Sequence, residues 1–395
     1  MCQRNMSIFN SNESRSGLRF AFRHGMCIAC WLLVIEILLQ IVVRLPESIS
    51  KHPRRFFSYG ATVETKLRQK FAQGEISKRS ILRAGWISPV IRESHREQYD
   101  VAFYGMSFTN QIADVMREVR SDLNILSIAG PGTPLSHSFE CHAMGSAEAN
   151  PKHAIIGVTG VWKLVSMTSD SLGNAGVQPC TFPRFKLKDG ELLKFSPALN
   201  SFEELENALQ QSTTWNQHIQ LLAQHDYFYN SLFYNANVFE KSILGRITLH
   251  GFREQRSNRL RSQIHNARGF TNHPVTRECA TIARRLLVEF QANARRRGQH
   301  AIVLLLHKKG YDDHLYRLLG ATLEEHQIDF VSTHSIFSSN EPSNFGSDHF
   351  HFTKENNLAI ADEILRLIRE NESRTAKNRC ELERFIAGSD SFQRL

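Results

Sequence analysis

Hydrophobic and polar positions change their pattern at Tyr99. Beyond it, short apolar runs alternate with amphipathic segments of helical spacing. Such alternation is typical of a parallel α/β sheet. The pattern predicts a three-layer α/β/α sandwich around a five-stranded, mostly parallel sheet. The predicted strands are DVAFYG (100–105), NILSIAG (124–130), HAIIGVTG (153–160), HAIVLLLH (300–307) and IDFVS (328–332), and the predicted helices cover roughly 108–120, 275–297, 311–326 and 353–370.

The third and fourth predicted strands are separated by a long insertion, residues 160–272. Loops of this length without structure of their own are uncommon, so we expect the insertion to fold and to cover or line the site. Within it, TFPRFKLKDGELLKFSP predicts a hairpin that turns at Asp189 and Gly190. An aromatic-rich stretch, HDYFYNSLFYNANVF, is expected to form a local core.

The domain that contains this sheet is predicted to span residues 98–371. Before it, residues 44–97 are expected to be a stalk with short helices, in which VETKLRQKFAQG has helical spacing and ends at Gly74. After it, residues 372–395 are polar and charged, and we expect a loosely ordered tail.

One long apolar run, MCIACWLLVIEILLQIVV (26–43), stands near the N-terminus. Its length suits one bilayer crossing, which takes about 17–25 residues, although Glu36 and Gln40 are costly where they face lipid. No small-residue cleavage site follows it, so an uncleaved transmembrane anchor is expected, with a buried core helix as the alternative. Arginines before the run favour a cytoplasmic N-terminal segment (1–25) and a domain on the extracytoplasmic, periplasmic side; they are Arg15, Arg19 and Arg23.

The composition suits a globular protein with a core: 41% of the 395 residues are hydrophobic, and the formal net charge is +9. A basic balance fits nucleic acid, anionic lipid or an acidic polymer as a partner, and equally a surface that is only soluble. No zinc-finger spacing, RNA-binding aromatic signature or P-loop occurs, so nucleic acid is not an expected partner.

The first predicted strand ends in a candidate nucleophile, Ser107. Gly105 is expected to let the backbone turn sharply, which places Ser107 at the carboxyl end of the strand and at a helix N-terminus. Ligands of open α/β sheets bind at this edge, and helix N-terminal amides stabilise a developing negative charge. The alternative is a serine that only caps the helix.

A nucleophilic serine needs a base, and the other end of the chain offers one in DHFH. Asp348 and His351 are three residues apart in a loop that enters the last helix near Thr353, with Asn356 three residues further on. This spacing lets the aspartate orient the imidazole while its other nitrogen faces the serine. His349 is the competing histidine, but its offset from Asp348 does not fit the D-x-x-H pattern.

With these motifs the chain resembles the SGNH (GDSL-type) hydrolase superfamily over residues 98–371. That family carries its nucleophile in a G-D-S motif after the first strand and its acid and base in a D-x-x-H motif before the last helix. Here GMS ends at Ser107, with Met106 in the place of the usual aspartate, and DHFH supplies Asp348 and His351. The resemblance implies a flavodoxin-like sandwich, a serine ester hydrolase and no cofactor.

The resemblance also implies an oxyanion hole, made by the Ser107 N–H and by residues after the second and third strands. In AGPGTP the donor would be Gly130 or Gly132, with Gly132 preferred. In GVTG, Thr159 stands where the family has asparagine. A lost donor costs about 2.7–4 kcal/mol unless Thr159, Asn110 or the insertion replaces it.

Cysteine and histidine positions give weaker indications. The spacing in HSFECH, with His137, Cys141 and His142, matches no strong zinc pattern, so no metal site is expected. Cys141 and Cys180 could pair in an oxidising compartment, a pairing that sequence leaves open.

Together these features predict an esterase that acts on O-acylated carbohydrate or lipid outside the cytoplasmic membrane. One alternative is an O-acyltransferase that uses the same triad. The other is a non-catalytic polysaccharide-binding or assembly protein on the same fold, suggested by Met106 and Thr159. Activity of the wild type and of Ser107→Ala would distinguish a catalytic from a non-catalytic protein.

Overall fold

The chain divides into two compact units. Unit 1 comprises Met1–Lys66 and Leu232–Arg256, and unit 2 comprises Leu67–Ser231 and Ser257–Leu395. The computed structural model describes residues 11–46, 49, 52–53, 56–57, 60–74, 91–92, 98–130, 133–145, 150–160, 164–168, 182–196, 199, 202–226, 228–235, 238–266 and 274–392.

Unit 2 is built around a six-stranded sheet with the strand order β1-β3-β2-β4-β7-β8. Five strands are parallel, which confirms the predicted sheet, and short β1 pairs antiparallel with β3 at one edge. With only two residues, β1 has no periodicity to detect, and it lies where the stalk was predicted. The strands are β1 (Ile91–Arg92), β2 (Val101–Met106), β3 (Ile125–Gly130), β4 (His153–Thr159), β7 (His300–Leu306) and β8 (Asp329–Ser332).

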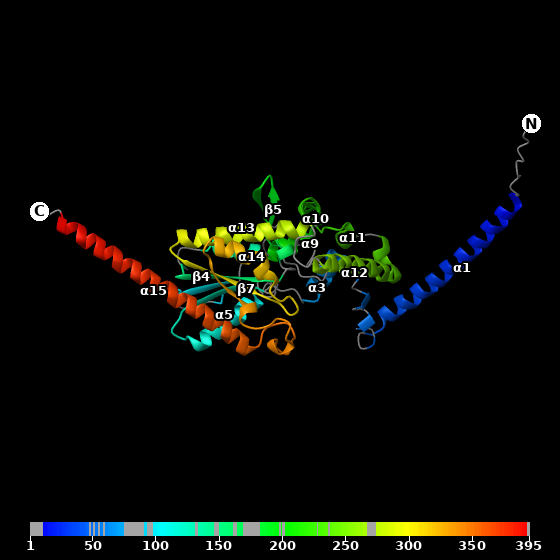
Figure 1. Cartoon of the computed structure of the whole chain (residues 1–395). Helices are drawn as coiled ribbons and strands as arrows, with labels where there is room; N and C mark the ends of the chain where they lie inside the picture. Colours follow the sequence, from blue (N-terminus) through cyan, green and yellow to red (C-terminus); the bar gives the residue numbers. More distant parts are fainter. Residues whose placement is uncertain are drawn as a thin grey trace, which may run out of the picture. The chain divides into compact units, whose positions relative to one another are not determined.

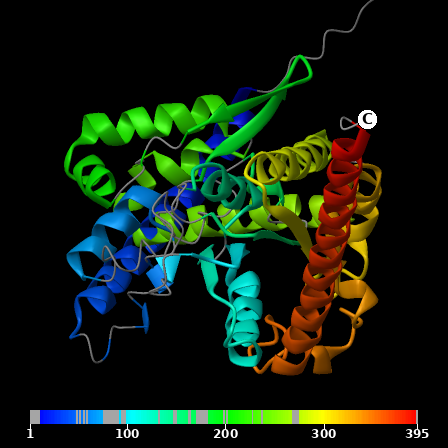
Figure 2. The same cartoon turned by 90° about the vertical axis from the view of Figure 1, so that its left-hand side faces the viewer.

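Helices cover both faces of this sheet and complete the three-layer sandwich (Figure 1). One face carries α6 (Leu135–Ala143), α13 (Pro274–Arg296) and α14 (His314–Glu325). The other carries α5 (Ser107–Val119) and α15 (Lys354–Phe392), which pack against each other (Figure 2).

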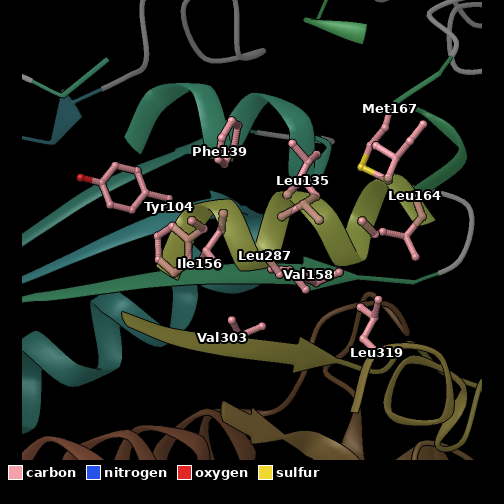
Figure 3. Packing of buried hydrophobic residues seen from close by; sticks show 14 of the residues in the cluster. Tyr104, Leu135, Phe139, Ile156, Val158, Leu164, Met167, Leu287, Val303 and Leu319 are labelled. Atoms are coloured by element: carbon pink, nitrogen blue, oxygen red, sulfur yellow. The ribbon is translucent and has the colours of Figure 1, made fainter. Parts of the chain in front are cut away.

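The alternation of side chains along each strand divides the core between the two faces. In β2, Ala102 and Tyr104 join the cluster under α6 and α13, while Val101 and Phe103 join the cluster under α5 and α15. Figure 3 shows Tyr104 packed with side chains of α6 and α13 in the first cluster. Burial on both faces explains why the strands read as continuous apolar runs.

The insertion contains structure of its own. β5 (Arg184–Lys188) and β6 (Glu191–Phe195) form the predicted antiparallel hairpin, in which Asp189 and Gly190 both have positive φ, 52° and 83°. Positive φ at both central residues is the type I′ geometry that favours Asp-Gly. Helical segments follow: α9 (Phe202–Gln210), α10 (Ser212–His225), α11 (Ser231–Tyr234), η2 (Val238–Lys241) and α12 (Ile243–Asn266).

The last helix is longer than expected. It was predicted to end near residue 370, but α15 continues to Phe392, so the expected loose tail is wrong over that range. No proline interrupts it, and the first glycine is Gly388. Arg366 pairs with Glu363 and Glu370 along the helix, and such pairs favour continuation.

Unit 1 begins with α1 (Ser11–Arg44), which contains the predicted anchor. Its segment Phe20–Arg44 is long and apolar enough to cross a membrane. Further along, α3 (Val63–Ala72) begins in unit 1, continues into unit 2 after Lys66 and confirms the helix predicted there. It is followed by Gly74, which has a φ of 68°.

Two short 3-10 turns complete the described elements. η3 (Thr333–Ser335) follows β8, and η4 (Pro342–Asn344) precedes the loop that leads into α15.

Candidate active site

Ser107 is the first residue of α5, directly after the buried strand β2. The N-cap position belongs to Met106, whose backbone is extended and whose side chain makes no capping bond. The hydroxyl of Ser107 is therefore available for another partner. The backbone N–H of Ser107 is among the first-turn amides that have no acceptor within the helix.

Gly105 has a different role from the one predicted. It lies inside β2 and is not among the glycines with positive φ, so it makes no sharp turn. A Cβ at Gly105 or at Gly157 would instead overlap the side chain of Thr109. The two glycines let the first turn of α5 approach β2 and β4 closely, and this approach fixes the position of Ser107.

The structure brings Ser107, His351 and Asp348 together. His351 Nε2 lies 2.8 Å from Ser107 Oγ, and His351 Nδ1 lies 2.6 Å from Asp348 Oδ2. The other carboxylate oxygen of Asp348 accepts the backbone N–H groups of Phe350 and His351, each at 2.9 Å. The hydrogen bond from His351, with these two amides, lowers the pKa of Asp348 to about 2. The carboxylate is thus charged and orients the imidazole with Nε2 toward the serine.

The loop that carries Asp348 and His351 is held at both ends. Gly346 N–H donates to the carbonyl of His351 at 2.8 Å, and Thr353 N–H donates to that of Asn344. The Thr353 hydroxyl accepts the Asn356 N–H at 3.3 Å, as expected of a cap of the last helix, while the Asn356 amide donates back to Asn344. The position of His351 is therefore coupled to the start of α15.

Aromatic rings flank His351 and were missed in the sequence. The rings of Phe108 and Phe350 have centroids 4.8 Å and 4.9 Å from that of the imidazole. Lys308 Nζ lies 4.5 Å from the centre of the Phe350 ring, so a positively charged group lies over the ring that flanks His351. The adjacency of Phe108 to Ser107 and of Phe350 to His351 was the available signal.

His349, the competing histidine, is exposed and has a positive φ of 54°. Its backbone N–H closes a turn on the Gly346 carbonyl at 2.8 Å. This turn brings His351, two residues later, to Ser107.

Of the predicted oxyanion donors, Ser107 N–H is at the helix start and Gly132 lies outside the described residues. Thr159 ends β4, and its buried hydroxyl lies 2.6 Å from Met106 Sδ. Asn110 donates to Asp114 and accepts from the Ser127 hydroxyl, both within 3.0 Å. The two residues that depart from the family pattern, Met106 and Thr159, thus contact each other.

The weaker cysteine and histidine candidates lie apart from this cluster. His137 Nε2 is 3.5 Å from Cys141 Sγ, and His142 Nε2 bonds Gln299 Oε1 at 2.9 Å. Within the described ranges no group of three or more His, Cys, Asp or Glu side chains is arranged to hold a metal ion. Cys180, the suggested partner of Cys141, lies outside those ranges.

Neither a protein-family model nor a curated protein matches the chain. Nine chains of solved structures match it, among them the following two. One is a provisionally named acylhydrolase from Bacteroides fragilis, with 10% identity, a TM-score of 0.35 and coverage of 71% of this chain and 89% of the other. The second is a GDSL-like lipase from Bacteroides thetaiotaomicron, with 8% identity, a TM-score of 0.35 and coverage of 78% and 99%.

Proposed function

We propose that this chain is a serine ester hydrolase of the SGNH type, anchored in a membrane by α1. The observation that carries the proposal is the continuous hydrogen-bonded series Ser107–His351–Asp348, with distances of 2.8 Å and 2.6 Å. A serine hydroxyl is a weak nucleophile unless an oriented base accepts its proton. All three side chains meet at the edge of the sheet where its parallel strands end, which is where such folds bind ligands.

In the proposed reaction, Ser107 Oγ attacks the carbonyl carbon of the ester while His351 Nε2 takes the hydroxyl proton. Asp348, charged and bonded to Nδ1, stabilises the imidazolium that results. The oxyanion forms near the first turn of α5, where the Ser107 N–H and, as proposed, the Gly132 N–H donate to it. Collapse releases the alcohol, which takes the proton from His351. Water then attacks the acyl-serine with His351 as the base. Cleavage of the bond between the acyl carbon and Ser107 Oγ releases the carboxylic acid, and His351 returns the proton to Ser107 Oγ.

The substrate we propose is an acyl ester of a carbohydrate or lipid outside the cytoplasmic membrane. The support is the apolar segment Phe20–Arg44, preceded in sequence by arginines that favour a cytoplasmic N-terminus. The domain that follows would then be extracytoplasmic, with surface or exported polysaccharide and membrane lipid within reach.

The first test is hydrolysis of p-nitrophenyl acetate by the full-length chain in detergent. Ser107→Ala and His351→Ala are expected to reduce turnover to background, while circular dichroism remains that of the wild type. The matched control is His349→Asn, which changes the neighbouring histidine and tolerates the positive φ at that position. It is expected to keep wild-type activity.

A fluorophosphonate probe provides a second readout that needs no natural substrate, because it reacts with activated serines. It should label the wild type and His349→Asn but not Ser107→Ala. A folded wild type that neither reacts with the probe nor hydrolyses the ester would contradict the proposal in favour of the non-catalytic alternative.

A further inference from the structure

Glu36 is the only carboxylate in the apolar segment Phe20–Arg44 of α1. It lies eight residues before Arg44, which is about 12 Å along the helix axis. A carboxylate at that depth in a bilayer is costly, and such residues are normally paired. The partners of Glu36 therefore indicate which part of unit 1 accompanies α1 into the membrane.

Those partners come from a segment about two hundred residues later. Glu36 accepts the N–H of Ile243 at 2.8 Å, the N–H of Leu244 at 3.0 Å and the hydroxyl of Ser242 at 3.0 Å. Gln40, one turn along α1, donates to the same carboxylate at 2.8 Å. The amides belong to the first turn of α12, which has no acceptor within the helix. The start of α12 is thereby held against α1 at Glu36.

The chain around this contact exposes large apolar side chains. We refer to the described residues of 232–256, which are 232–235 and 238–256, as the clasp segment. Its exposed apolar residues belong to α11, η2 and α12, and cations flank two of them. The exposed fractions are 43% for Leu232, 74% for Val238, 59% for Phe239 and 62% for Phe252, and the exposed cations are Lys241 and Arg256.

Close backbone packing and hydrogen bonds also hold the clasp segment in place within unit 1. Gly245 has no Cβ, which allows the backbone of Phe239 to lie against the first turn of α12. The buried guanidinium of Arg253 donates to the carbonyl groups of Gly60 and Ala61 at 2.6 Å and 2.9 Å. Exposed Val238 and Phe239 are therefore presented by a fixed support within unit 1.

We propose that the clasp segment is a second membrane-inserted element, beside α1. Val238, Phe239 and Phe252 would enter the boundary between headgroups and acyl chains, and Lys241 and Arg256 would contact anionic headgroups. Apolar side chains flanked by cations are typical of segments that lie in this boundary. The inference rests on the proposed anchor, since it requires α1 to cross the bilayer.

The test uses the full chain in vesicles of phosphatidylcholine and phosphatidylglycerol, with or without phosphatidylcholine brominated on its acyl chains. Bromine quenches tryptophan only at close range. Comparing wild type with Trp31→Phe isolates the emission of Trp31 in α1. Comparing Phe239→Trp with wild type isolates the emission from the clasp segment. Val119→Trp is the control, at an exposed apolar position of unit 2.

The expected result is that brominated lipid quenches both the Trp31 emission and the emission added by Phe239→Trp, while the emission added by Val119→Trp persists. If Trp31 is quenched and the added emission of Phe239→Trp is not, the inference is overturned and the anchor stands. The same conclusion holds if the emission added by Phe239→Trp is blue-shifted but unquenched. Such emission would indicate that another protein surface, or a second copy of this chain, covers the clasp segment. If Trp31 is not quenched, the anchor fails and the inference fails with it.

The contact itself is tested by hydrogen exchange at the amides of Ile243 and Leu244. Glu36→Leu removes the acceptor, so exchange at both amides should accelerate at least about tenfold, as for amides released from a hydrogen bond. Glu36→Gln retains one acceptor oxygen and should show a smaller acceleration. Unchanged exchange in Glu36→Leu would show that Glu36 does not hold α12, and would overturn the inference.

Discussion

Asp348 acts, in the proposed mechanism, through the orientation of His351. Because its pKa is lowered to about 2, the carboxylate remains charged throughout the usual assay range. Asp348→Asn would favour the wrong imidazole tautomer, and we expect kcat to fall by about 10⁴-fold, the loss typical of this change in serine hydrolases. Steady-state kinetics with p-nitrophenyl acetate measure the fall. A loss smaller than tenfold would show that the loop positions His351 without the charge.

Thr159 stands where the resemblance places an oxyanion donor, yet its hydroxyl lies against Met106 Sδ at 2.6 Å. If that contact is its role, Thr159→Val should lower kcat by less than about tenfold. Removal of a true oxyanion donor costs about 10²–10³ in kcat. The p-nitrophenyl acetate assay distinguishes these two roles of the Thr159 hydroxyl. A hundredfold loss of kcat would show that the hydroxyl donates to the oxyanion.

At the scale of elements, the close approach of α5 to β4 depends on Gly157. Gly157→Ala would overlap Thr109, and overpacking of this kind costs about 1–3 kcal/mol. We expect a lower melting temperature together with lower activity, because Ser107 sits at the start of the displaced helix. Thr109→Ala in the same chain should restore both.

The control for this prediction is Gly251→Ala, since a Cβ at Gly251 meets no atom within 4 Å. That change should leave both readouts unaltered. If Gly157→Ala melts and turns over like the wild type, the strands and α5 adjust to one another more freely than the packing indicates.

Sequence alone was sufficient to predict the elements that are marked by a pattern in neighbouring residues. The five parallel strands begin and end within two residues of their predictions, because each is a continuous apolar run closed by polar residues or glycine. The order of the motifs also related Ser107 to His351, which the structure places in contact across 244 residues.

Features that depend on distant partners were not predictable. From the sequence, Glu36 was identified only as a costly charge in an apolar run. Its partners, Ile243 and Leu244, lie about two hundred residues away and leave no local signal. The insertion was treated as one body, although residues 232–256 group with the N-terminal segment in unit 1. Gly105 was assigned a turn because its contact, Thr109, becomes close only after α5 packs.

At the scale of the whole molecule, buried histidines make stability sensitive to acid. Burial lowers the pKa of five of them from 6.5 to about 4 in the folded chain, while unfolding restores the ordinary value. Between these pH values the unfolded state binds more protons, so the free energy of unfolding falls as the pH falls. The five are His137, His142, His153, His218 and His307.

Each of these histidines contributes up to about 1.4 kcal/mol per pH unit in that interval. Urea unfolding of the full chain can be monitored by circular dichroism at several pH values between neutral and 4. The urea concentration at the unfolding midpoint should decrease steadily as the pH falls. His349→Asn, which alters an exposed histidine, should leave the slope as in the wild type. A midpoint independent of pH would mean that the buried imidazoles are protonated in the folded chain.

The 244 residues of sequence between Ser107 and His351 also impose a delay during synthesis, between the appearance of the serine and that of its base. Chains are made from the N-terminus at about 5–20 residues per second, so the 244 residues between the two take about 12–50 s to appear. During that interval α1 is already available to the membrane, whereas the serine has no base and α15 does not yet exist. If α1 is the anchor, as proposed, a nascent chain is attached to the membrane before its serine has a base. An incomplete chain released at any point before His351 cannot attack esters by the proposed mechanism.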